Sequence, residues 1–250
     1  MTEARALLVY SPRLCKVLQV GQIYLDEVHV RAKGLLAGLS ALAVAVYVGA
    51  WIGWRVGWSW LATIDSTTLA VAHRIGVEHP AWAIFWNAWC TVFSPGVFRL
   101  VTVALIVYAL VRRDWRVAVF LLLTVELSGP LTELAKHFAD RPRPATAMVY
   151  ASSTSFPSGH ALGTMACVLA LAVVLLPHVR RGLWPWLIAA GVVIVVSVGL
   201  GRVALNVHHL SDVVAGWALG YLYFTLCLPV LSRRAVITGG ETPATPGTER

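Results

Sequence analysis

Long apolar runs separated by short polar segments make up most of the chain from residue 34 onward. An apolar run of about 20 residues is long enough to cross the hydrocarbon core of a bilayer as a helix. The pattern therefore predicts an all-α protein, built as a six-span transmembrane helical bundle. The predicted spans are residues 34–54, 95–111, 115–136, 160–176, 184–205 and 210–230.

Two stretches depart from this simple alternation. Residues 81–111 are too long for one regular span and are interrupted by a Ser-Pro-Gly sequence at residues 94–96. Proline and glycine favour a break in a helix, so residues 81–94 are interpreted as an interfacial segment that precedes the second span. Residues 65–76 are more polar and are interpreted as a short surface helix.

The two ends of the chain are more polar than the region between them. Residues 1–33 carry charges of both signs and contain no compact apolar core followed by a small-residue cleavage site. A cleaved signal peptide is therefore not expected, and the sequence predicts a cytoplasmic N-terminal tail that can lie on the membrane surface. Residues 34–232 form the predicted membrane domain, and residues 233–250 are predicted to be a disordered cytoplasmic tail.

Composition supports a membrane protein and weakens two other possibilities. The chain is 58% hydrophobic and 13% charged, with a mean hydropathy of +0.73, whereas a soluble domain is about 45–50% apolar and about 25% charged. The net charge of +8 is attributed to cytoplasmic Lys and Arg side chains, so no nucleic-acid partner is expected. The four cysteines are scattered and form no Cys-x-x-Cys pair, which favours neither a disulfide framework nor a zinc site.

The distribution of Lys and Arg predicts the orientation of the bundle. Six spans place both termini on one side, and that side carries thirteen of the twenty Lys and Arg residues. They lie in residues 1–33, 112–116, 180–181 and 233–250. Because cytoplasmic loops are enriched in positive charge, both termini are predicted to be cytoplasmic. The polar segments around residues 137–158 and 202–212 then share the extracytoplasmic face.

The first polar stretch on that face is basic. Lys136, Arg141 and Arg143 lie close together at the predicted outer end of the third span. A basic border normally marks the cytoplasmic side of a membrane, so extracytoplasmic cations require another explanation. A bound phosphate supplies one, because Arg offers a bidentate fork to phosphate and Lys a mobile point charge.

The second stretch, Phe-Pro-Ser-Gly-His at residues 156–160, leads into the fourth span. The N-terminus of a helix exposes backbone N–H groups at the positive end of the helix dipole and favours an anion. Gly159 allows a ligand to approach the backbone closely. His160 is placed to donate a proton at the rim of such a site. A helix cap formed by Ser158 beside an interfacial histidine is the alternative.

The third stretch lies between the last two spans and carries Arg202, His208 and Asp212. His208 and Asp212 are four residues apart, so on a helix they share one face. A carboxylate beside an imidazole fixes its tautomer and leaves the other ring nitrogen free to attack or to bind a metal. A capping or structural pair is the alternative. Together, the cations, the helix N-terminus and the two imidazoles favour phosphoryl chemistry without a metal.

These three stretches resemble the motifs of the type 2 phosphatidic acid phosphatase superfamily, which comprises integral membrane lipid phosphate phosphatases. The matching patterns are Lys136-x6-Arg143-Pro144, Pro157-Ser158-Gly159-His160 and Arg202-x5-His208-x3-Asp212. They occur in the family's order and at the ends of predicted spans, and the resemblance covers about residues 60–230.

The resemblance implies a role for each matched residue. His208 attacks phosphorus and forms a phosphohistidine, while Asp212 orients its ring. His160 protonates the leaving lipid oxygen and then activates water. The phosphate oxygens are held by Lys136, Arg143, Arg202, Ser158 and Gly159. The family chemistry uses no cofactor and no metal.

One position departs from the family pattern. Gly201 precedes Arg202 where the family usually has serine. The side-chain contact of that serine with the phosphate would be absent, which is expected to weaken binding but to leave the nucleophile in place.

Other charged residues in or near the spans are candidates for supporting roles. Arg141 is two residues from Arg143 and is considered as a further phosphate ligand, and Glu133 is three residues before Lys136 and can position its amine. A charge at bilayer depth is costly and usually functional or paired. Glu126 and Glu133 are both interpreted as structural or positioning residues rather than as parts of a proton path. Arg99 either pairs with one of these two carboxylates or binds the substrate head group.

The predicted function is hydrolysis of a membrane lipid phosphate or diphosphate at the extracytoplasmic face of a bacterial plasma membrane. Candidate substrates are an isoprenoid (di)phosphate, phosphatidic acid and phosphatidylglycerol phosphate. A lipid-linked phosphotransferase with the same intermediate is the alternative among enzymes, and a transporter with buried Glu and Arg is the alternative from another class. The lipid and the oligomeric state remain open.

Overall fold

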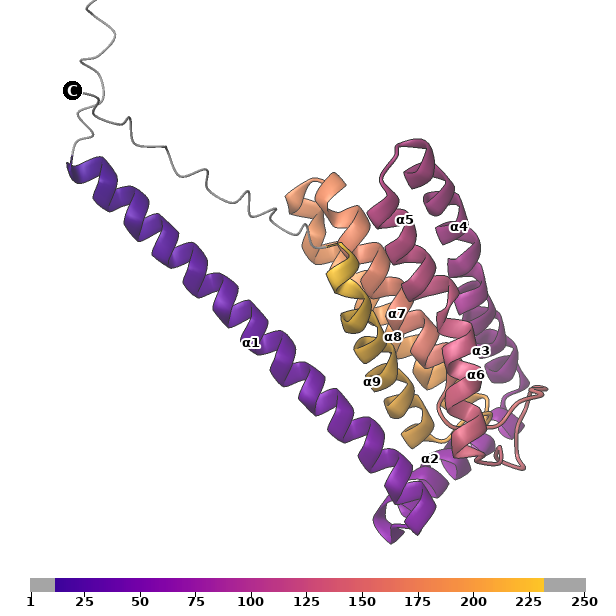
Figure 1. Cartoon of the computed structure of the whole chain (residues 1–250). Coiled ribbons are helices and arrows are strands. Elements are labelled where there is room, and N and C mark those ends of the chain that lie inside the picture. Colours follow the sequence, from indigo (N-terminus) through magenta and orange to yellow (C-terminus); the bar gives the residue numbers. More distant parts are fainter. Residues whose placement is uncertain (1–11, 232–250) are drawn as a thin grey trace, which may run out of the picture.

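The computed structural model of the protein describes residues 12–231, and these residues form helices and loops without any strand (Figure 1). The longer helices are α1 (Pro12–Val56), α2 (Ser59–Glu78), α3 (Pro80–Val92), α4 (Pro95–Val111), α5 (Trp115–Leu121), α6 (Ser128–Ala139), α7 (Gly159–Leu175), α8 (Trp184–Ala204) and α9 (Leu210–Cys227). A π-helical turn, η1 (Leu122–Glu126), joins α5 to α6. Short 3-10 turns occupy Leu176–His178, Arg181–Leu183 and Leu228–Val230.

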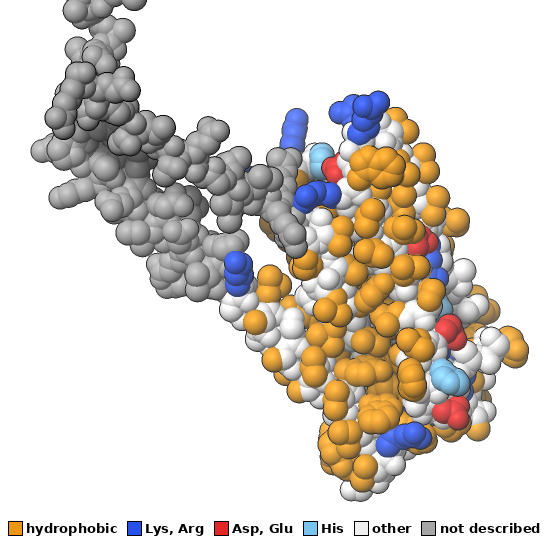
Figure 2. Space-filling view, viewed as in Figure 1, with side chains coloured by type: hydrophobic (Ala, Val, Ile, Leu, Met, Phe, Trp, Pro, Cys, Tyr) orange, Lys and Arg blue, Asp and Glu red, His pale blue; other side chains and the backbone are white. Residues whose placement is uncertain are grey.

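The prediction of an all-α bundle with six membrane spans is confirmed. Six segments of the described chain are long and apolar enough to cross a bilayer, namely Lys33–Val56, Pro80–Val111, Trp115–Ala139, Gly159–His178, Arg181–Ala204 and Leu210–Val230. Hydrophobic side chains cover most of the face shown in Figure 2, as expected for a surface in contact with lipid. The protein is therefore an integral membrane protein.

The predicted tails fall partly outside the described residues. Residues 1–11 and 232–250 are not described, so the predicted disordered tail at residues 233–250 lies outside the described residues. Residues 12–33, assigned to the N-terminal tail from the sequence, belong to α1 and continue without a break into the first span. The described chain begins and ends at the same end of the bundle (Figure 1). That this end is cytoplasmic stays a prediction.

The interpretation of residues 81–94 as an interfacial segment stays a prediction, but the second candidate span is longer than predicted and includes them. They form α3, which continues into α4 as one candidate span after a bend where Ser94 accepts a hydrogen bond from the Val97 amide at 3.3 Å. The indole of Trp89 donates a hydrogen bond of 2.9 Å to the hydroxyl of Ser197 on α8. The helix is thus held along α8 as the lower half of a bent span.

The predicted surface helix at residues 65–76 is part of α2, which crosses the lower end of the bundle in Figure 1 and is not one of the six candidate spans. Its position depends on a charged side chain. Asp65 is 2% exposed and faces the bundle rather than solvent. The contacts of this carboxylate make α2 part of the site described below.

Two glycines let α9 lie unusually close to α7. A Cβ atom on Gly216 would lie 2.6 Å from the Ser158 carbonyl oxygen, and one on Gly220 would lie 2.5 Å from the Leu162 carbonyl oxygen. Small residues four apart allow such close helix contact in membranes. The backbone amide of Ser158 also donates a hydrogen bond of 2.9 Å to the Asp212 carbonyl. The start of α7 is therefore fixed beside the start of α9.

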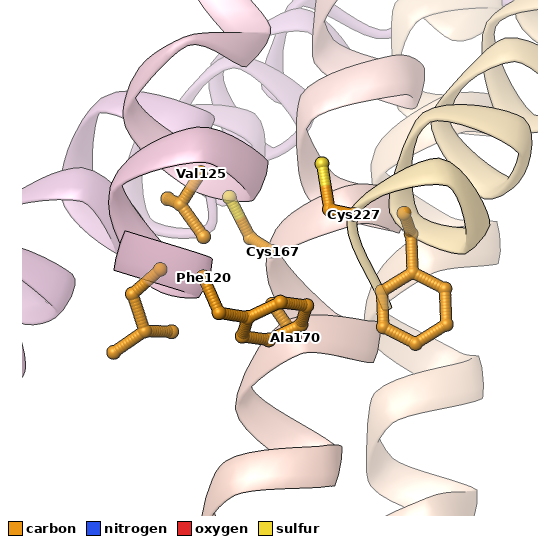
Figure 3. Packing of buried hydrophobic residues seen from close by; sticks show 7 residues of the cluster. Phe120, Val125, Cys167, Ala170 and Cys227 are labelled. Atoms are coloured by element: carbon orange, nitrogen blue, oxygen red, sulfur yellow. The ribbon is translucent and has the colours of Figure 1, made fainter. Parts of the chain in front are cut away.

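The main apolar cluster lies toward the other end of the bundle, where α5, η1, α7 and α9 meet (Figure 3). The rings of Phe120 and Phe224 pack edge to face with centroids 6.3 Å apart. In η1, the Leu127 amide reaches back five residues to Leu122, and the Tyr223 hydroxyl donates a hydrogen bond of 2.6 Å to the Leu123 carbonyl. The carbonyl released by the π-turn is thus satisfied inside the membrane, as the hydrocarbon environment requires.

Candidate active site

The three polar stretches meet in a cavity of about 470 Å³ at the end of the bundle opposite the described chain ends. The walls come from the first turns of α4 and α7, from α6 and α8, and from the loops that precede α7 and α9. The predicted site residues in its lining are Glu133, Lys136, Arg143, Gly159, His160, Arg202 and His208. Side chains far apart in the sequence are thus brought to one place.

Arg143 ties the two loops of the site together. Its guanidinium donates hydrogen bonds of 2.6 Å to the Ser153 carbonyl and 2.7 Å to the Val207 carbonyl. The same group lies 3.2 Å from Nε2 of His208. A guanidinium can only donate, so Nε2 of His208 is the acceptor, and its lone pair is directed at an arginine that lines the same cavity.

The other ring nitrogen of His208 faces a carboxylate. Nδ1 lies 3.6 Å from Oδ2 of Asp212, which is longer than a hydrogen bond but close enough for the carboxylate to stabilise a positive charge that develops on the ring. Burial, and then the positive charges of Arg143 and Arg202, lower the pKa of His208 to about 4, although Asp212 acts in the opposite direction. The imidazole is therefore neutral at pH 7, the form in which Nε2 can attack an electrophile.

Lys136 is buried at the end of α6 and extends into the cavity. Its ammonium donates a hydrogen bond of 2.6 Å to the Ser153 hydroxyl and lies 3.7 Å from Oε1 of Glu133. The Glu133 side chain is 66% exposed, so it screens the amine without enclosing it. Ser153 therefore links the two cations Lys136 and Arg143, one through its hydroxyl and the other through its carbonyl.

The start of α7 contributes Gly159 and His160 to the cavity, but not Ser158. The Ser158 amide is already bonded to the Asp212 carbonyl, and the Ser158 hydroxyl is buried without a hydrogen-bond partner among residues 33–231. Ser158 is therefore not placed to contact a phosphate in the cavity, contrary to the expectation from the motif. Its visible role is to fix α7 against α9.

Asp212 receives hydrogen bonds from several sides. Oδ1 accepts one of 2.6 Å from Arg141, and Oδ2 accepts one of 2.8 Å from the His209 amide. The Ser155 hydroxyl also donates to Oδ2, and Nδ1 of His209 lies 3.1 Å from it. A fully buried carboxylate needs such partners to remain charged. The carboxylate is thus held rigidly behind the His208 ring.

Arg141 lies outside the cavity, contrary to the expectation that it assists Arg143 in holding a phosphate. Its guanidinium spans two buried carboxylates, at 2.6 Å from Asp212 and 2.8 Å from Asp65, and lies over the Trp54 ring at 4.8 Å. The Ser211 hydroxyl completes the group through contacts with Arg141 and Asp65. Arg141 therefore supports the carboxylate behind His208 and is not placed to touch a ligand in the cavity.

The sequence interpretation missed four residues of this site. They are Asp65, Ser153, Ser155 and His209. His209 occupies the N-cap of α9 with Asp212 three residues later, and this capping-box spacing is a recognisable signal. The two serines lie in a Ser-rich loop, and Asp65 lies on a distant helix. Their partners could not be chosen from local spacing.

The structure gives a physical reason for Gly201. A Cβ atom at this position would lie 2.7 Å from Sγ of Cys90 and 2.8 Å from a ring carbon of Trp86. Both side chains belong to α3. Glycine at this position therefore allows α3 to pack closely on α8, immediately before Arg202, where a serine side chain would collide with α3.

Replacing Gly201 with serine should lower the thermal unfolding midpoint of the purified protein in detergent. Overpacking of this kind costs about 1–3 kcal/mol. Gly49→Ser is the matched control, because a Cβ atom there meets nothing within 4 Å. The double variant Cys90→Ala/Gly201→Ser should recover part of the loss. Equal midpoints for the Gly201 and Gly49 variants would contradict this explanation.

Comparison with known proteins agrees with the resemblance seen in the motifs. Residues 117–235 match the family model of the PAP2 superfamily. Phosphatidylglycerophosphatase B of Bacillus subtilis is 36% identical over 120 residues, which are 46% of this chain and 58% of that protein. Lipid A 1-phosphatase of Rhizobium johnstonii is 27% identical over 169 residues, which are 63% of this chain and 65% of that protein. The chain thus spans less than two thirds of either relative.

A solved structure shares the fold. The crystal structure of a transmembrane PAP2 type phosphatidylglycerolphosphate phosphatase from Bacillus subtilis matches with a TM-score of 0.63 at 24% identity. The match covers 78% of this chain and 94% of that one. The arrangement of helices around the cavity is therefore that of a known membrane fold.

Proposed function

We propose that the protein is a membrane phosphatase that removes phosphate from a lipid phosphate or diphosphate, and the match of residues 117–235 to the family model of the PAP2 superfamily supports this proposal. The observation that carries this proposal is the cavity itself. His208 lines it together with Lys136, Arg143 and Arg202, and Nε2 of His208 lies 3.2 Å from the Arg143 guanidinium. A neutral nucleophile surrounded by fixed cations suits attack on an anionic phosphoryl group.

The first step of the proposed reaction transfers the phosphoryl group to His208. Its Nε2 lone pair attacks phosphorus while the bond from phosphorus to the lipid oxygen breaks. His160, in the lining of the same cavity, gives a proton to the departing oxygen. The cations of the cavity stabilise the charge spread over the remaining phosphoryl oxygens, and Asp212 stabilises the positive charge that His208 acquires.

The second step returns the enzyme to its starting state. His160, now neutral, takes a proton from a water molecule, and the water oxygen attacks phosphorus. The bond between phosphorus and Nε2 breaks, so the electron pair returns to His208 and inorganic phosphate leaves. We propose that this chemistry takes place at the extracytoplasmic face of a bacterial plasma membrane. The cavity lies opposite the described chain ends, and the distribution of Lys and Arg predicts that those ends are cytoplasmic.

A phosphate-release assay over a panel of lipids tests the proposal. Purified protein in mixed micelles is given phosphatidic acid, phosphatidylglycerol phosphate and an isoprenoid diphosphate, each with and without an alcohol acceptor. The expected result is free phosphate from at least one lipid without any acceptor. Phosphate that appears only on the acceptor would identify a phosphotransferase, and no turnover of any lipid would refute a phosphatase.

The state of His208 gives a prediction for pH dependence. Since its pKa is lowered to about 4, the ring should stay neutral and nucleophilic from pH 7 down to about pH 4, whereas an unperturbed histidine is half protonated at about pH 6.5. Nitrogen-15 NMR of histidine-labelled protein, with the His208→Asn variant for assignment, measures this titration. A midpoint near pH 6.5 for the His208 signal would contradict the prediction.

We also expect phosphate release to continue in excess EDTA. Among the described residues, no group of three or more His, Cys, Asp or Glu side chains is placed to hold a metal ion. The charge of the transferred group is instead opposed by Lys136, Arg143 and Arg202. Activity that disappears on chelation and returns with a divalent cation would contradict a metal-independent reaction.

A further inference from the structure

Arg99 is a charged residue of the cavity that the proposed reaction does not use. It lies in the first two turns of α4 and lines the cavity together with Gly96, Gly129 and Thr132. It also belongs to the candidate span Pro80–Val111. An arginine at membrane depth is costly and normally pairs with an acid or serves a ligand.

The described residues provide Arg99 with no acidic partner within ion-pair distance. Its Nη2 donates one hydrogen bond, of 3.2 Å, to the Ser128 hydroxyl, and its Nε is buried without a partner among residues 33–231. Glu126, one of the two acids considered for it from the sequence, accepts a hydrogen bond of 2.8 Å from the Thr102 hydroxyl instead. The positive charge of Arg99 is therefore available to a ligand.

The guanidinium of Arg99, which belongs to α4, lies beside α6, and its position next to that helix gives its distance from Lys136. A Cβ atom on Gly129 would lie 2.9 Å from Nη2 of Arg99, so the guanidinium rests against the backbone at residue 129. Lys136 follows seven residues later on the same helix. At a rise of 1.5 Å per residue this separation is about 10 Å. The same cavity thus offers an outer cluster of cations and one inner cation, with Thr132 and Glu133 between them.

The surface next to Arg99 is apolar and open. On α4, the neighbouring Leu100 is 75% exposed and Val103 is 49% exposed, and both are part of the face that lipid would contact. Arg99 therefore lies between the cavity and the region where the acyl chains of a bound lipid must run. A ligand group at Arg99 would be nearer to the lipid tail than the phosphate at His208.

We propose that Arg99 binds a second anionic group of the substrate, a phosphodiester located between the lipid tail and the terminal phosphate that is removed. The inference rests on the proposed function and specifies its substrate class. In a diphosphate the two phosphorus atoms share one oxygen, which places both at the outer cations. A glycerol linker between two phosphates matches the separation of the two cation sites more closely.

Binding measurements on protein that cannot turn over its ligand test this subsite. In a His208→Asn background, dissociation constants are measured in nanodiscs for phosphatidylglycerol phosphate, which carries both groups, and for phosphatidic acid, which carries one. Adding Arg99→Gln should weaken binding of the first lipid about tenfold, as loss of a charge-assisted hydrogen bond predicts. Binding of phosphatidic acid should change less than twofold, and Arg99→Lys should fall between wild-type and glutamine affinity for the first lipid.

The control is Arg112→Gln, an exposed arginine in the turn at the other end of the bundle, which should alter neither affinity. Equal weakening of both lipids, or no weakening of either, would overturn the proposal for Arg99. Because these constants do not depend on catalysis, failure of the proposed phosphatase activity would appear separately, in the phosphate-release assay.

Discussion

Replacing His208 with asparagine should abolish phosphate release while the protein remains folded. The imidazole ring of His208 lies between two charged groups. The Arg143 guanidinium is 3.2 Å from Nε2, and the buried Asp212 carboxylate is 3.6 Å from Nδ1. Loss of a nucleophile in a concerted site typically costs about 10⁴-fold or more in turnover. Asparagine retains a polar side chain in a position that is 2% exposed. Turnover is measured as phosphate released per minute from the best lipid of the panel.

A matched control and a trapping experiment separate chemistry from folding. His178 is an exposed histidine in the 3-10 turn after α7, and its Nδ1 lies 3.0 Å from the Val174 carbonyl oxygen, so His178→Asn should retain full activity. Brief incubation with a lipid carrying phosphorus-32 should label the wild-type protein and leave His208→Asn unlabelled. The label should survive base and be lost in acid, as expected for a phosphohistidine. Near wild-type turnover by His208→Asn, with correct folding, would refute the assignment of the nucleophile.

His160→Asn addresses the proton donor in the same assay. General acid catalysis contributes about 10²–10⁴-fold, so a smaller loss than that of His208→Asn is expected. The loss should be smallest for a substrate with a good leaving group, because such a group needs little protonation. Equal losses for substrates with good and poor leaving groups would argue against His160 as the acid.

The sequence was sufficient for the bundle and for the residues at the ends of its spans. Span length follows from bilayer thickness, and the spacing of His208 and Asp212 is a local property of one turn. The motifs could therefore be placed at one end of the bundle by counting spans. Their meeting around one cavity then follows from the packing of α7 on α9, which Gly216 and Gly220 permit.

The sequence was insufficient wherever the direction of a side chain depends on tertiary contacts. Arg141 and Arg143 are two residues apart in an irregular loop, yet one contacts Asp65 and the other contacts His208. No helical or strand periodicity governs such a loop, so their separation could not be deduced. The continuation of α3 into α4 as one candidate span was not predicted for a similar reason, because local sequence does not show whether a proline marks a bend in a helix or its start.

Replacing Arg141 with glutamine should destabilise the protein strongly. The side chain lies between the carboxylates of Asp65 and Asp212, which are 3% and 0% exposed. Without the guanidinium, these two buried negative charges lose their common partner. Removing one member of a buried ion pair typically costs about 3–5 kcal/mol. The thermal unfolding midpoint in detergent and the yield of monodisperse protein measure the effect.

The same variant separates a supporting role from a ligand role. If Arg141 acts through Asp212, Arg141→Lys should recover stability only in part, because an ammonium cannot bond both carboxylates with a planar fork. The control is Arg74→Gln, an exposed arginine on the same helix as Asp65, which should leave the midpoint unchanged. Asp65→Asn should also lower turnover, although its carboxylate lies outside the cavity, because Arg141 would lose one of the contacts that hold it against Asp212.

A stable Arg141→Gln protein with a raised KM and an unchanged kcat would instead make Arg141 a phosphate ligand. That result would require the loop to rearrange when substrate binds, since the guanidinium lies outside the cavity and faces the carboxylates behind His208.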